Sequence, residues 1–344
     1  MSILEKEIFE QPEVIRRLLE TETENVNQLV AQLRGCFKYI LIAARGSSDN
    51  AARYAQYLFG AYNGFPVSLT TPSLFTLYHR PPRLDGALVI GISQSGQSPD
   101  IVEVVAEGRR QNQPTLAITN DPASPLSKTA EYFIRLNSGP ERAIAATKTY
   151  TASLGVLSLF SAAYEGDIER LIQLQRLPDL MEQTLNLLMP VLKRVERYRY
   201  MAHCIVIGRG FNYGTAFEIA LKIKELTQTI TEPYSSADFR HGPIAMVRDG
   251  FPVMVIAPKG MVQDDISELI TDLKKRDAEL LIISDDPKLL DQAHLALPIS
   301  PDVPEWLSPL IAVIPGQLFG LALTQARGLN PDLPHGLTKV TETL

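Results

Sequence analysis

The chain has 344 residues, of which 45% are hydrophobic and 21% charged, and its formal net charge is −6. A chain of this length can bury two hydrophobic cores. The acidic balance and the lack of a long basic run argue against nucleic acid as a partner. Apolar runs stay short of the roughly 18 residues that cross a bilayer, so no membrane association is expected.

A few residues indicate the cellular compartment and whether a metal or cofactor is expected. The N-terminal segment is charged and lacks the apolar core of a signal peptide. Cys36 and Cys204 each lie at the entrance to an expected strand, where we predict small core hydrophobes rather than a disulfide pair. These features favour a cytoplasmic location. Cysteine, histidine and carboxylates do not gather at metal-ligand spacing, so we expect neither a metal nor a cofactor.

Short apolar runs alternate with helical patterns along the chain. Residues 4–34 favour one or two helices, broken near Gln11 and Pro12. A first series of strands is then expected at 39–44, 66–70, 87–92, 115–119 and 132–136. Long helical periodicity covers 147–200, and a second series of strands is expected at 203–207, 252–257, 280–283 and 295–299. Near-continuous apolar strands separated by helices indicate parallel sheets that are covered on both faces.

The two series of strands repeat each other. The run from Tyr39 matches the run from His203, and the run from Gly86 matches the run from Gly250 at the same offset along the sequence. A third pair, 115–122 and 280–287, follows in the same order at almost the same offset. Three matched segments at nearly constant spacing indicate a duplicated domain.

We therefore predict an α/β fold of two tandem, doubly wound, parallel-sheet domains of flavodoxin-like or Rossmann-like type, with flanking helices. The expected order is N-terminal helices at 1–34, a first domain at 35–165, linking helices at 166–194, a second domain at 195–334 and a C-terminal tail at 335–344. The apolar helices around 147–165 and 180–195 could form a subunit interface.

Polar side chains gather in the loop after the expected strand 87–92. The loop reads Ser93-Gln94-Ser95-Gly96-Gln97-Ser98 and opens a helix at Pro99. Ligands bind beyond the carboxyl ends of parallel strands, and a helix N-terminus offers free N–H groups to a phosphate. The loop 45–48 ends a neighbouring strand and could add Ser47 and Ser48. The alternative is that Ser98 or Asp100 only caps the helix.

The matching loop of the second repeat, Pro258-Lys259-Gly260, has lost the hydroxyls. The chain also lacks the glycine-rich motifs that bind nucleotide phosphates and the turn that presents a serine nucleophile. A nucleotide is therefore a poor candidate for the ligand.

Charged residues share one face of the helix expected at about 214–229. Glu218, Lys222, Glu225 and Thr229 follow one another at helical spacing. For an arbitrary helix, an exposed ion-paired stripe is the favoured alternative.

Two further residues can carry protons. His241 precedes a Gly-Pro turn and belongs to the residue type that can carry protons near neutral pH, although an isolated histidine is more often structural. Lys339 lies in a polar segment near the C-terminus, where a lysine is usually solvated.

Six motifs occur in the order that is typical of one family: ARGSS, SQSGQSPD, ATKTY, ALKIKE, RHGPIAM and LTKVTET. Together they resemble the sugar isomerase (SIS) family over nearly the whole chain, from about residue 10. Within that family the sequence is most similar to the isomerase half of glutamine–fructose-6-phosphate aminotransferase (glucosamine-6-phosphate synthase). The ARGSS and TKVTET segments are closest to the stand-alone glucosamine-6-phosphate deaminases.

The resemblance implies a sugar phosphate as substrate and a role for each matching residue. Glu225 would move a proton between C1 and C2, Lys222 would lie one turn away, and Lys339 would form an imine with the open-chain ketose. His241 would assist ring opening, often from the partner subunit, so a homodimer is expected. Substrate and phosphate contacts would come from Gly46, Ser47, Ser48, Ser93, Gln94, Ser95, Gly96, Ser98, Ala145 and Thr147.

The sequence departs from the aminotransferase in its first segment. That enzyme begins with a glutaminase domain, whereas the first motif here arrives by residue 46, so we expect no such domain. The expected reaction is deamination of glucosamine 6-phosphate to fructose 6-phosphate and ammonia through an open-chain imine or enolamine. Alternatives are isomerisation alone, ammonia-dependent synthesis, deglycation of a 6-phosphorylated fructosamine, and a non-catalytic sugar-phosphate sensor.

Smaller departures concern single positions. Arg45 stands where the synthase has cysteine, and His335-Gly336 stands where it has Arg-Asn. They bear on substrate detail rather than on the fold.

Overall fold

A computed structural model describes residues 1–339 of the chain, so the last five residues of the predicted tail 335–344 lie outside the described residues. The chain divides into two compact units, each built from several segments. Unit 1 contains Met1–Pro12, Arg142–Thr147 and Leu177–Leu337. Unit 2 contains Glu13–Glu141, Lys148–Arg176, Thr338 and Lys339.

The predicted flanking helices are divided between these units. The N-terminal pair is α1 (Ile3–Phe9), which belongs to unit 1, and α2 (Gln11–Leu33), which belongs to unit 2 from Glu13 onward. In the linking region, α8 (Ile168–Gln175) belongs to unit 2 and α9 (Leu177–Leu188) to unit 1. The units therefore differ from the contiguous domains that were expected from the sequence.

Unit 2 contains a parallel sheet of five strands in the order β2-β1-β3-β4-β5. All five expected strands of the first series are confirmed: β1 (Tyr39–Ala43), β2 (Val67–Leu69), β3 (Ala87–Ile92), β4 (Thr115–Thr119) and β5 (Tyr132–Arg135). The central strand β3 is buried at every position, which explains its unbroken apolar sequence. Besides α2 and α8, this unit contains the helices α3 (Ser47–Asn63), α4 (Ser73–Thr76), α5 (Pro99–Arg110), α6 (Pro125–Thr129) and α7 (Lys148–Glu165).

Unit 1 repeats this sheet in the order β10-β9-β8-β6-β7. Its strands are β6 (His203–Gly208), β7 (Ile230–Ser235), β8 (Pro252–Ile256), β9 (Glu279–Ser284) and β10 (Leu295–Pro298). The strand β7 was not predicted, because its sequence ITEPYS contains a proline and no apolar run; it lies at the sheet edge, where it pairs with β6. It is the counterpart of β2, so the two sheets have the same topology.

Helices of unit 1 follow the same plan, with a few short additions. Besides α1 and α9, they are η1 (Leu192–Tyr198), η2 (Gly210–Asn212), α10 (Tyr213–Thr227), α11 (Ser236–Arg240), η3 (Pro243–Met246), α12 (Gln263–Lys274), α13 (Pro287–Leu290), η4 (Glu305–Leu307) and α14 (Ser308–Ala326). In each unit, one hydrophobic core lies between one face of the sheet and the helix that follows the third strand. This helix is α5 in unit 2 and α12 in unit 1.

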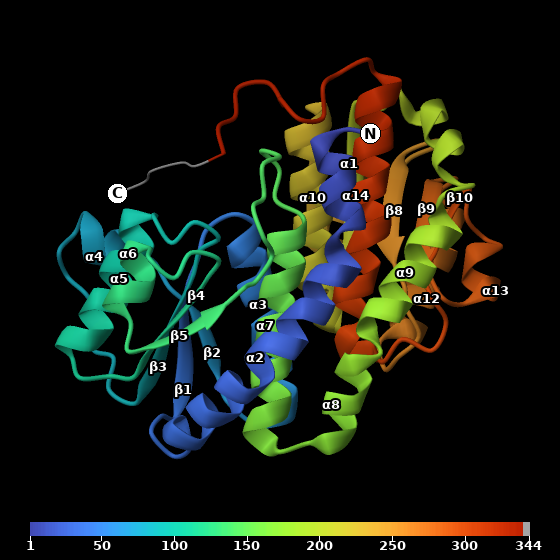
Figure 1. The fold of residues 1–344 in the computed structure, drawn as a ribbon. Coiled ribbons are helices and arrows are strands. Elements are labelled where there is room, and N and C mark those ends of the chain that lie inside the picture. The colour runs from blue at the N-terminus through green and yellow to red at the C-terminus, as the bar shows by residue number, and fades with distance from the viewer. Residues whose placement is uncertain (340–344) are drawn as a thin grey trace. The chain divides into compact units, whose positions relative to one another are not determined.

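The other helices pair with each other. In unit 2, α3 packs against α7, and in unit 1, α10 packs against α14 (Figure 1). The approach of α14 to α10 needs a glycine, because a Cβ atom at Gly316 would lie 2.3 Å from Ile219 Cγ1. The charged helix α10 is therefore held by close backbone packing.

The helix α14 corrects one expectation from composition. Within Glu305–Ala326, an apolar window of 18 residues has a mean hydropathy of 1.6, and by length and composition this one helix of the described chain could cross a membrane. However, 94% of the apolar window is buried inside the protein. Its hydrophobicity is therefore that of a core helix.

Other expectations about the surface also change. Cys36 is exposed, because α2 ends at Leu33 and a turn at Gly35 leaves Cys36 outside the strand. Cys204 is buried as expected, and burial raises the pKa of its thiol to about 12.

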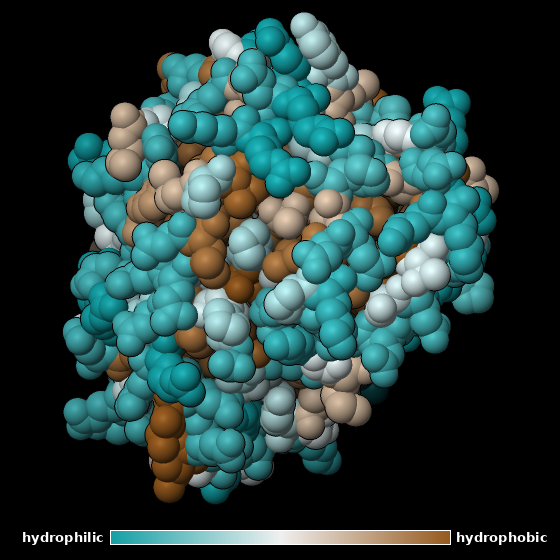
Figure 2. All heavy atoms as spheres, turned by 90° about the vertical axis from the view of Figure 1, so that its right-hand side faces the viewer, coloured by the Kyte–Doolittle hydropathy of each residue, from teal (hydrophilic) through white to brown (hydrophobic). Residues whose placement is uncertain are grey.

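The helix α7 is buried along most of its length, so its apolar residues form core rather than free surface. The face drawn in Figure 2 is largely hydrophilic, with apolar side chains gathered near its middle.

Candidate functional site

The loop between β3 and α5 carries hydroxyl groups that the fold does not use for capping. Ser98 is the N-cap residue of α5, yet among residues 1–339 its side chain makes no hydrogen bond to the helix backbone. Its Oγ lies 3.4 Å from Ser93 Oγ instead. The Gln94 side chain likewise has no hydrogen-bond partner in the described chain. The capping alternative is therefore wrong for Ser98, and these groups can serve an anion at the helix N-terminus.

The loop needs a glycine at its centre. Gly96 has φ +64°, and a Cβ atom there would lie 2.3 Å from Ser124 Oγ. Gly96 N donates to Ser93 O and Ser93 Oγ, both at 3.2 Å, and Leu126 N donates to Gly96 O at 3.1 Å. The loop backbone is thus held in one tight conformation that leaves the serine side chains beyond the strand end.

The loop after β1 is linked to this one by an ion pair. Arg45 Nε donates to Asp100 Oδ2 at 2.8 Å, and Asp100 Oδ1 accepts from Ile101 N at 2.9 Å. The Asp100 side chain is fully buried, whereas 52% of the Arg45 side chain is exposed. Asp100 is therefore bound to arginine and does not act as a simple cap. Gly46, Ser47 and Ser48 follow Arg45 at the start of α3.

Unit 1 places three charged side chains together on α10. Lys222 Nζ lies 2.5 Å from Glu225 Oε2 and 3.6 Å from Glu218 Oε1. The Lys222 and Glu218 side chains are buried, while 24% of the Glu225 side chain is exposed. An ammonium group is stable in the interior only when carboxylates neutralise it. The alternative of an exposed ion-paired stripe is therefore wrong, and Glu225 is the member of this cluster that reaches solvent.

Thr229 does not belong to the charged helical face. The helix α10 ends at Thr227, because Gln228 adopts a left-handed conformation with φ +57°. Thr229 Oγ1 then accepts a hydrogen bond from Arg327 Nη1 at 2.9 Å. This residue stabilises the end of the helix.

His241 lies at the end of α11, in the exposed turn that precedes Gly242. Among the residues that the structure describes, no side chain bonds to its imidazole. A structural histidine is expected to have such a partner when it is buried. The exposure of His241 therefore leaves its imidazole available to a ligand.

Lys339 is not solvated as its sequence position implied. Its Nζ lies 2.8 Å from Glu141 Oε2, and the Glu141 side chain is fully buried. Glu141 also accepts from Thr149 N at 3.1 Å and from Thr149 Oγ1 at 2.8 Å. Lys339 thus belongs to the same unit as the Ser93–Ser98 loop.

The predicted substrate contacts Ala145 and Thr147 lie in the segment Arg142–Thr147 of unit 1. Both are buried. The segment is fixed by Glu7 Oε1, which accepts from Arg142 N at 2.5 Å.

The structure therefore divides the predicted residues into two sets. Unit 2 holds Lys339, Gly46, Ser47, Ser48, Ser93, Gln94, Ser95, Gly96 and Ser98, whereas unit 1 holds Lys222, Glu225, His241, Ala145 and Thr147.

Two ion pairs were not predicted from the sequence, namely Lys339 with Glu141 and Arg45 with Asp100. Glu141 stands in an irregular segment, where no periodicity marks it. The pairing of Arg45 with Asp100 could have been found from the repeat, because Arg209 and Asp265 form the equivalent pair at the matching positions of the second copy.

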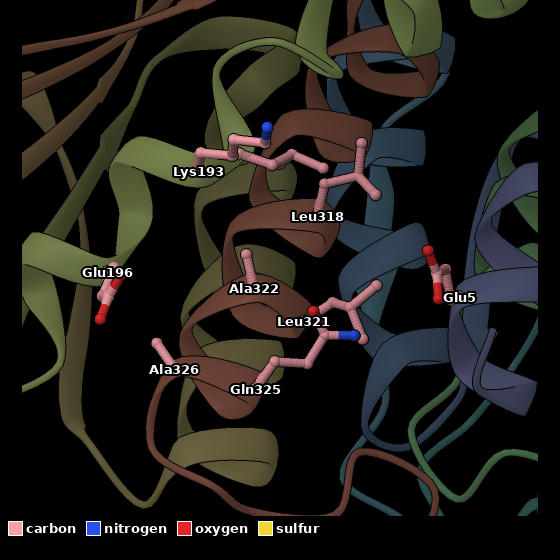
Figure 3. A pocket seen from close by; sticks show the side chains of 9 residues that line it. Glu5, Lys193, Glu196, Leu318, Leu321, Ala322, Gln325 and Ala326 are labelled. Atoms are coloured by element: carbon pink, nitrogen blue, oxygen red, sulfur yellow. The ribbon is translucent and has the colours of Figure 1, made fainter.

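A separate pocket of about 390 Å³ lies in unit 1, lined by apolar residues of α14 such as Leu318 and Leu321 and by Glu5, Lys193 and Glu196 (Figure 3). Of the predicted site residues that the structure describes, none lines this pocket.

Comparison with known proteins agrees with the repeat. The SIS domain profile matches residues 36–163 and 200–324, which contain the two sheets. The glutamine–fructose-6-phosphate aminotransferase of Aquifex aeolicus (strain VF5) is 33% identical over 337 residues. That match covers 97% of this chain and 56% of the relative, so the chain spans about half the length of the curated relatives it matches.

Two solved structures share the fold over almost the whole chain. The C-terminal domain of glucosamine-fructose-6-phosphate aminotransferase from Francisella tularensis has a TM-score of 0.88 and 25% identity, covering 97% of this chain and 98% of that one. A provisionally assigned phosphosugar isomerase from Silicibacter pomeroyi DSS-3 has a TM-score of 0.87 and 30% identity, covering 96% and 100%. The chain belongs to the SIS domain family, with two such domains in tandem.

Proposed function

We propose that this chain is an enzyme that interconverts glucosamine 6-phosphate with fructose 6-phosphate and ammonia. The observation that carries the proposal is the cluster on α10, in which a buried lysine holds the partly exposed carboxylate of Glu225. A carboxylate in that setting suits a general base, because it is oriented by its partner and still reaches a substrate.

The remaining roles follow from the chemistry of each group. The hydroxyls of Ser93, Ser95 and Ser98 bind the sugar phosphate at the N-terminus of α5. His241 assists opening of the sugar ring. Glu225 then takes a proton from C2 and returns it to C1, which converts the amino aldose into the imine of the ketose.

Lys339 completes the reaction in this proposal. Its amine replaces ammonia at C2 to form a lysine imine, and water releases fructose 6-phosphate. In total, glucosamine 6-phosphate and water yield fructose 6-phosphate and ammonia, so the atoms balance. The reverse direction is synthesis from free ammonia.

The exposed position of His241 supports a second part of the proposal, namely that the enzyme acts as a homodimer. A closed two-fold dimer is the commonest assembly of soluble proteins. In such a dimer the imidazole can serve the substrate of the partner subunit. The exposed apolar residues Leu187 and Met189, at the end of α9, are candidate interface material.

An ammonia-release assay on a panel of phosphorylated sugars tests the function. We expect release from glucosamine 6-phosphate and little from unphosphorylated glucosamine. Release of a free amino acid from a 6-phosphorylated fructosamine would instead identify a deglycase, and interconversion of sugar phosphates without ammonia would identify an isomerase. Tight binding without turnover of any member would identify a sensor and contradict the proposal.

A further inference from the structure

Glu141 is a buried carboxylate whose orientation is fixed by its own neighbourhood. Thr149 N donates to Glu141 Oε1, and Thr149 Oγ1 donates to Glu141 Oε2. Thr149 lies in the first turn of α7, where the helix dipole favours a negative charge. These contacts span only eight residues of the sequence, so they orient the carboxylate independently of Lys339.

Lys339 reaches this carboxylate from 198 residues away in the sequence. One quarter of the Lys339 side chain is exposed, whereas Glu141 is fully buried. Salt screens a partly buried pair much less than a surface pair. The contact therefore gives the C-terminal segment a defined docking point in the unit that carries the Ser93–Ser98 loop.

We propose that Glu141 is the positioning residue of Lys339, which docks the lysine ammonium and, in the direction of synthesis, accepts its proton when the amine attacks the ketose carbonyl. The proton-accepting part rests on the proposed function, in which Lys339 forms the imine. The docking part stands on the contacts of Glu141 alone.

The proton transfers balance in this scheme. The ammonium gives one proton to Glu141 Oε2, and the freed nitrogen lone pair attacks C2 while the carbonyl electron pair moves to oxygen. A second proton moves from nitrogen to that oxygen and forms a carbinolamine. Glu141 then returns its proton to the hydroxyl, which leaves as water, and the nitrogen lone pair forms the protonated imine.

The variant Glu141→Gln tests both parts, because glutamine keeps the size of the side chain and cannot accept the proton. The first readout is borohydride trapping of the imine with fructose 6-phosphate across a pH series. We expect the trapping rate at neutral pH to fall roughly 100-fold, the size of a lost proton acceptor, and to recover as the pH rises. The second readout is hydrogen–deuterium exchange of the C-terminal peptide, which we expect to accelerate.

Binding of inorganic phosphate provides an internal check, since Glu141 is not a member of the phosphate loop. We expect its affinity to be unchanged in Glu141→Gln. Asp167→Asn is the matched control, because Asp167 and the buried Arg170 form another ion pair of 2.8 Å in the same unit. This control is expected to keep wild-type trapping and wild-type exchange of the tail.

If Glu141→Gln does not fold, Thr149→Val decides. Valine removes the hydroxyl that donates to Glu141 but keeps the backbone donor, so both readouts should move in the same direction by less. A folded Gln variant, or in its place the Val variant, with wild-type trapping and wild-type tail exchange would overturn the proposal. Wild-type enzyme that traps no imine would instead contradict the role of Lys339 in the proposed function, and tail exchange would still decide whether Glu141 docks it.

Discussion

Unit 1 and unit 2 contain the same sheet but differ in the helix that follows their first strand. In unit 1, one face of α10 carries the charged residues Glu218, Lys222 and Glu225. The matching positions on α3 of unit 2 carry Tyr54, Leu58 and Ala61. Burial raises the pKa of Tyr54, whose hydroxyl bonds to Ser158. At these matched positions, carboxylates that could accept a proton occur on α10 and not on α3.

The loops after the third strand of each sheet also differ, but here the candidate binding groups lie in unit 2 rather than in unit 1. In unit 2, the serine hydroxyls before α5 make their hydrogen bonds within the loop itself, and no carboxylate of the described chain bonds to the loop. In unit 1, the corresponding loop is bound by the protein's own carboxylates, since Lys259 N donates to Asp285 at 2.8 Å and Met261 N donates to Glu305 at 3.0 Å. In the proposed function, the loop of unit 2 binds the substrate phosphate and α10 of unit 1 transfers the proton, so the two tasks fall on different copies of the repeat.

The largest effect is expected at the charged helix. Glu225→Gln keeps the shape of the side chain and removes the proton acceptor, so turnover should fall by about 10²–10⁴. Steady-state kinetics and circular dichroism measure the loss and confirm the fold. A variant that loses only thermal stability would mean that Glu225 serves structure.

The two loops can be compared directly by matched substitutions. Ser95→Leu should raise the KM for phosphorylated substrates about tenfold to a hundredfold, because a charge-assisted hydrogen bond contributes about 1.5–3 kcal/mol. Lys259→Leu changes the corresponding residue of unit 1, and its KM should stay at the wild-type value. Equal activity of the wild type on unphosphorylated glucosamine would contradict a phosphate site.

Complementation between two inactive variants tests whether His241 of one subunit acts at the site of its partner in the proposed dimer. Mixing Glu225→Gln chains with His241→Asn chains should restore about a quarter of wild-type activity, because half of the dimers are mixed and each has one intact site. Activity is measured after subunit exchange and after mass spectrometry has verified the mixed dimers. Verified mixed dimers without activity would place His241 in the chemistry of its own chain, or outside it.

The smallest expected effect concerns stability. Burial disfavours ionisation of Asp265, but hydrogen bonds from Ser236 and Arg240 outweigh it and hold its pKa below the usual range. The resulting stabilisation is present above the unfolded pKa of about 3.9 and is lost as the pH falls through the lower folded pKa. Asp265→Asn should therefore lower the free energy of unfolding by about 1–3 kcal/mol at pH 7.

Urea unfolding at pH 7 and pH 3 checks this prediction, with the difference between wild type and variant shrinking at pH 3. Asp272→Asn is the control, because Asp272 pairs with Lys275 on the exposed face of the same helix. It should leave the unfolding midpoint unchanged. An Asp265 variant as stable as the wild type at pH 7 would contradict the account.

Strands of the central sheets could be predicted because burial on both faces leaves a continuous apolar sequence. The edge strand β7 could not, because its sequence ITEPYS mixes polar residues with a proline and contains no apolar run. The division of α1 and α2 between units was also missed, because a break near Gln11 locates a helix end and says nothing of what each helix packs against.

Site residues that lie on regular helices could also be predicted from the periodicity of the sequence. Helical spacing placed Lys222 and Glu225 on one face, but spacing alone could not show that the face is buried. Glu141 could not be predicted as a site residue, because its contact with Lys339 spans 198 residues and neither residue lies in a periodic segment.

The central claim is that one of the two loops binds the sugar phosphate. Isothermal titration calorimetry with glucosamine 6-phosphate, using the Glu225→Gln variant to prevent turnover, measures this directly. We predict one site per chain, greatly weakened by adding Ser95→Leu and unchanged by adding Lys259→Leu. Two equivalent sites per chain, or loss of binding with Lys259→Leu and not with Ser95→Leu, would contradict it.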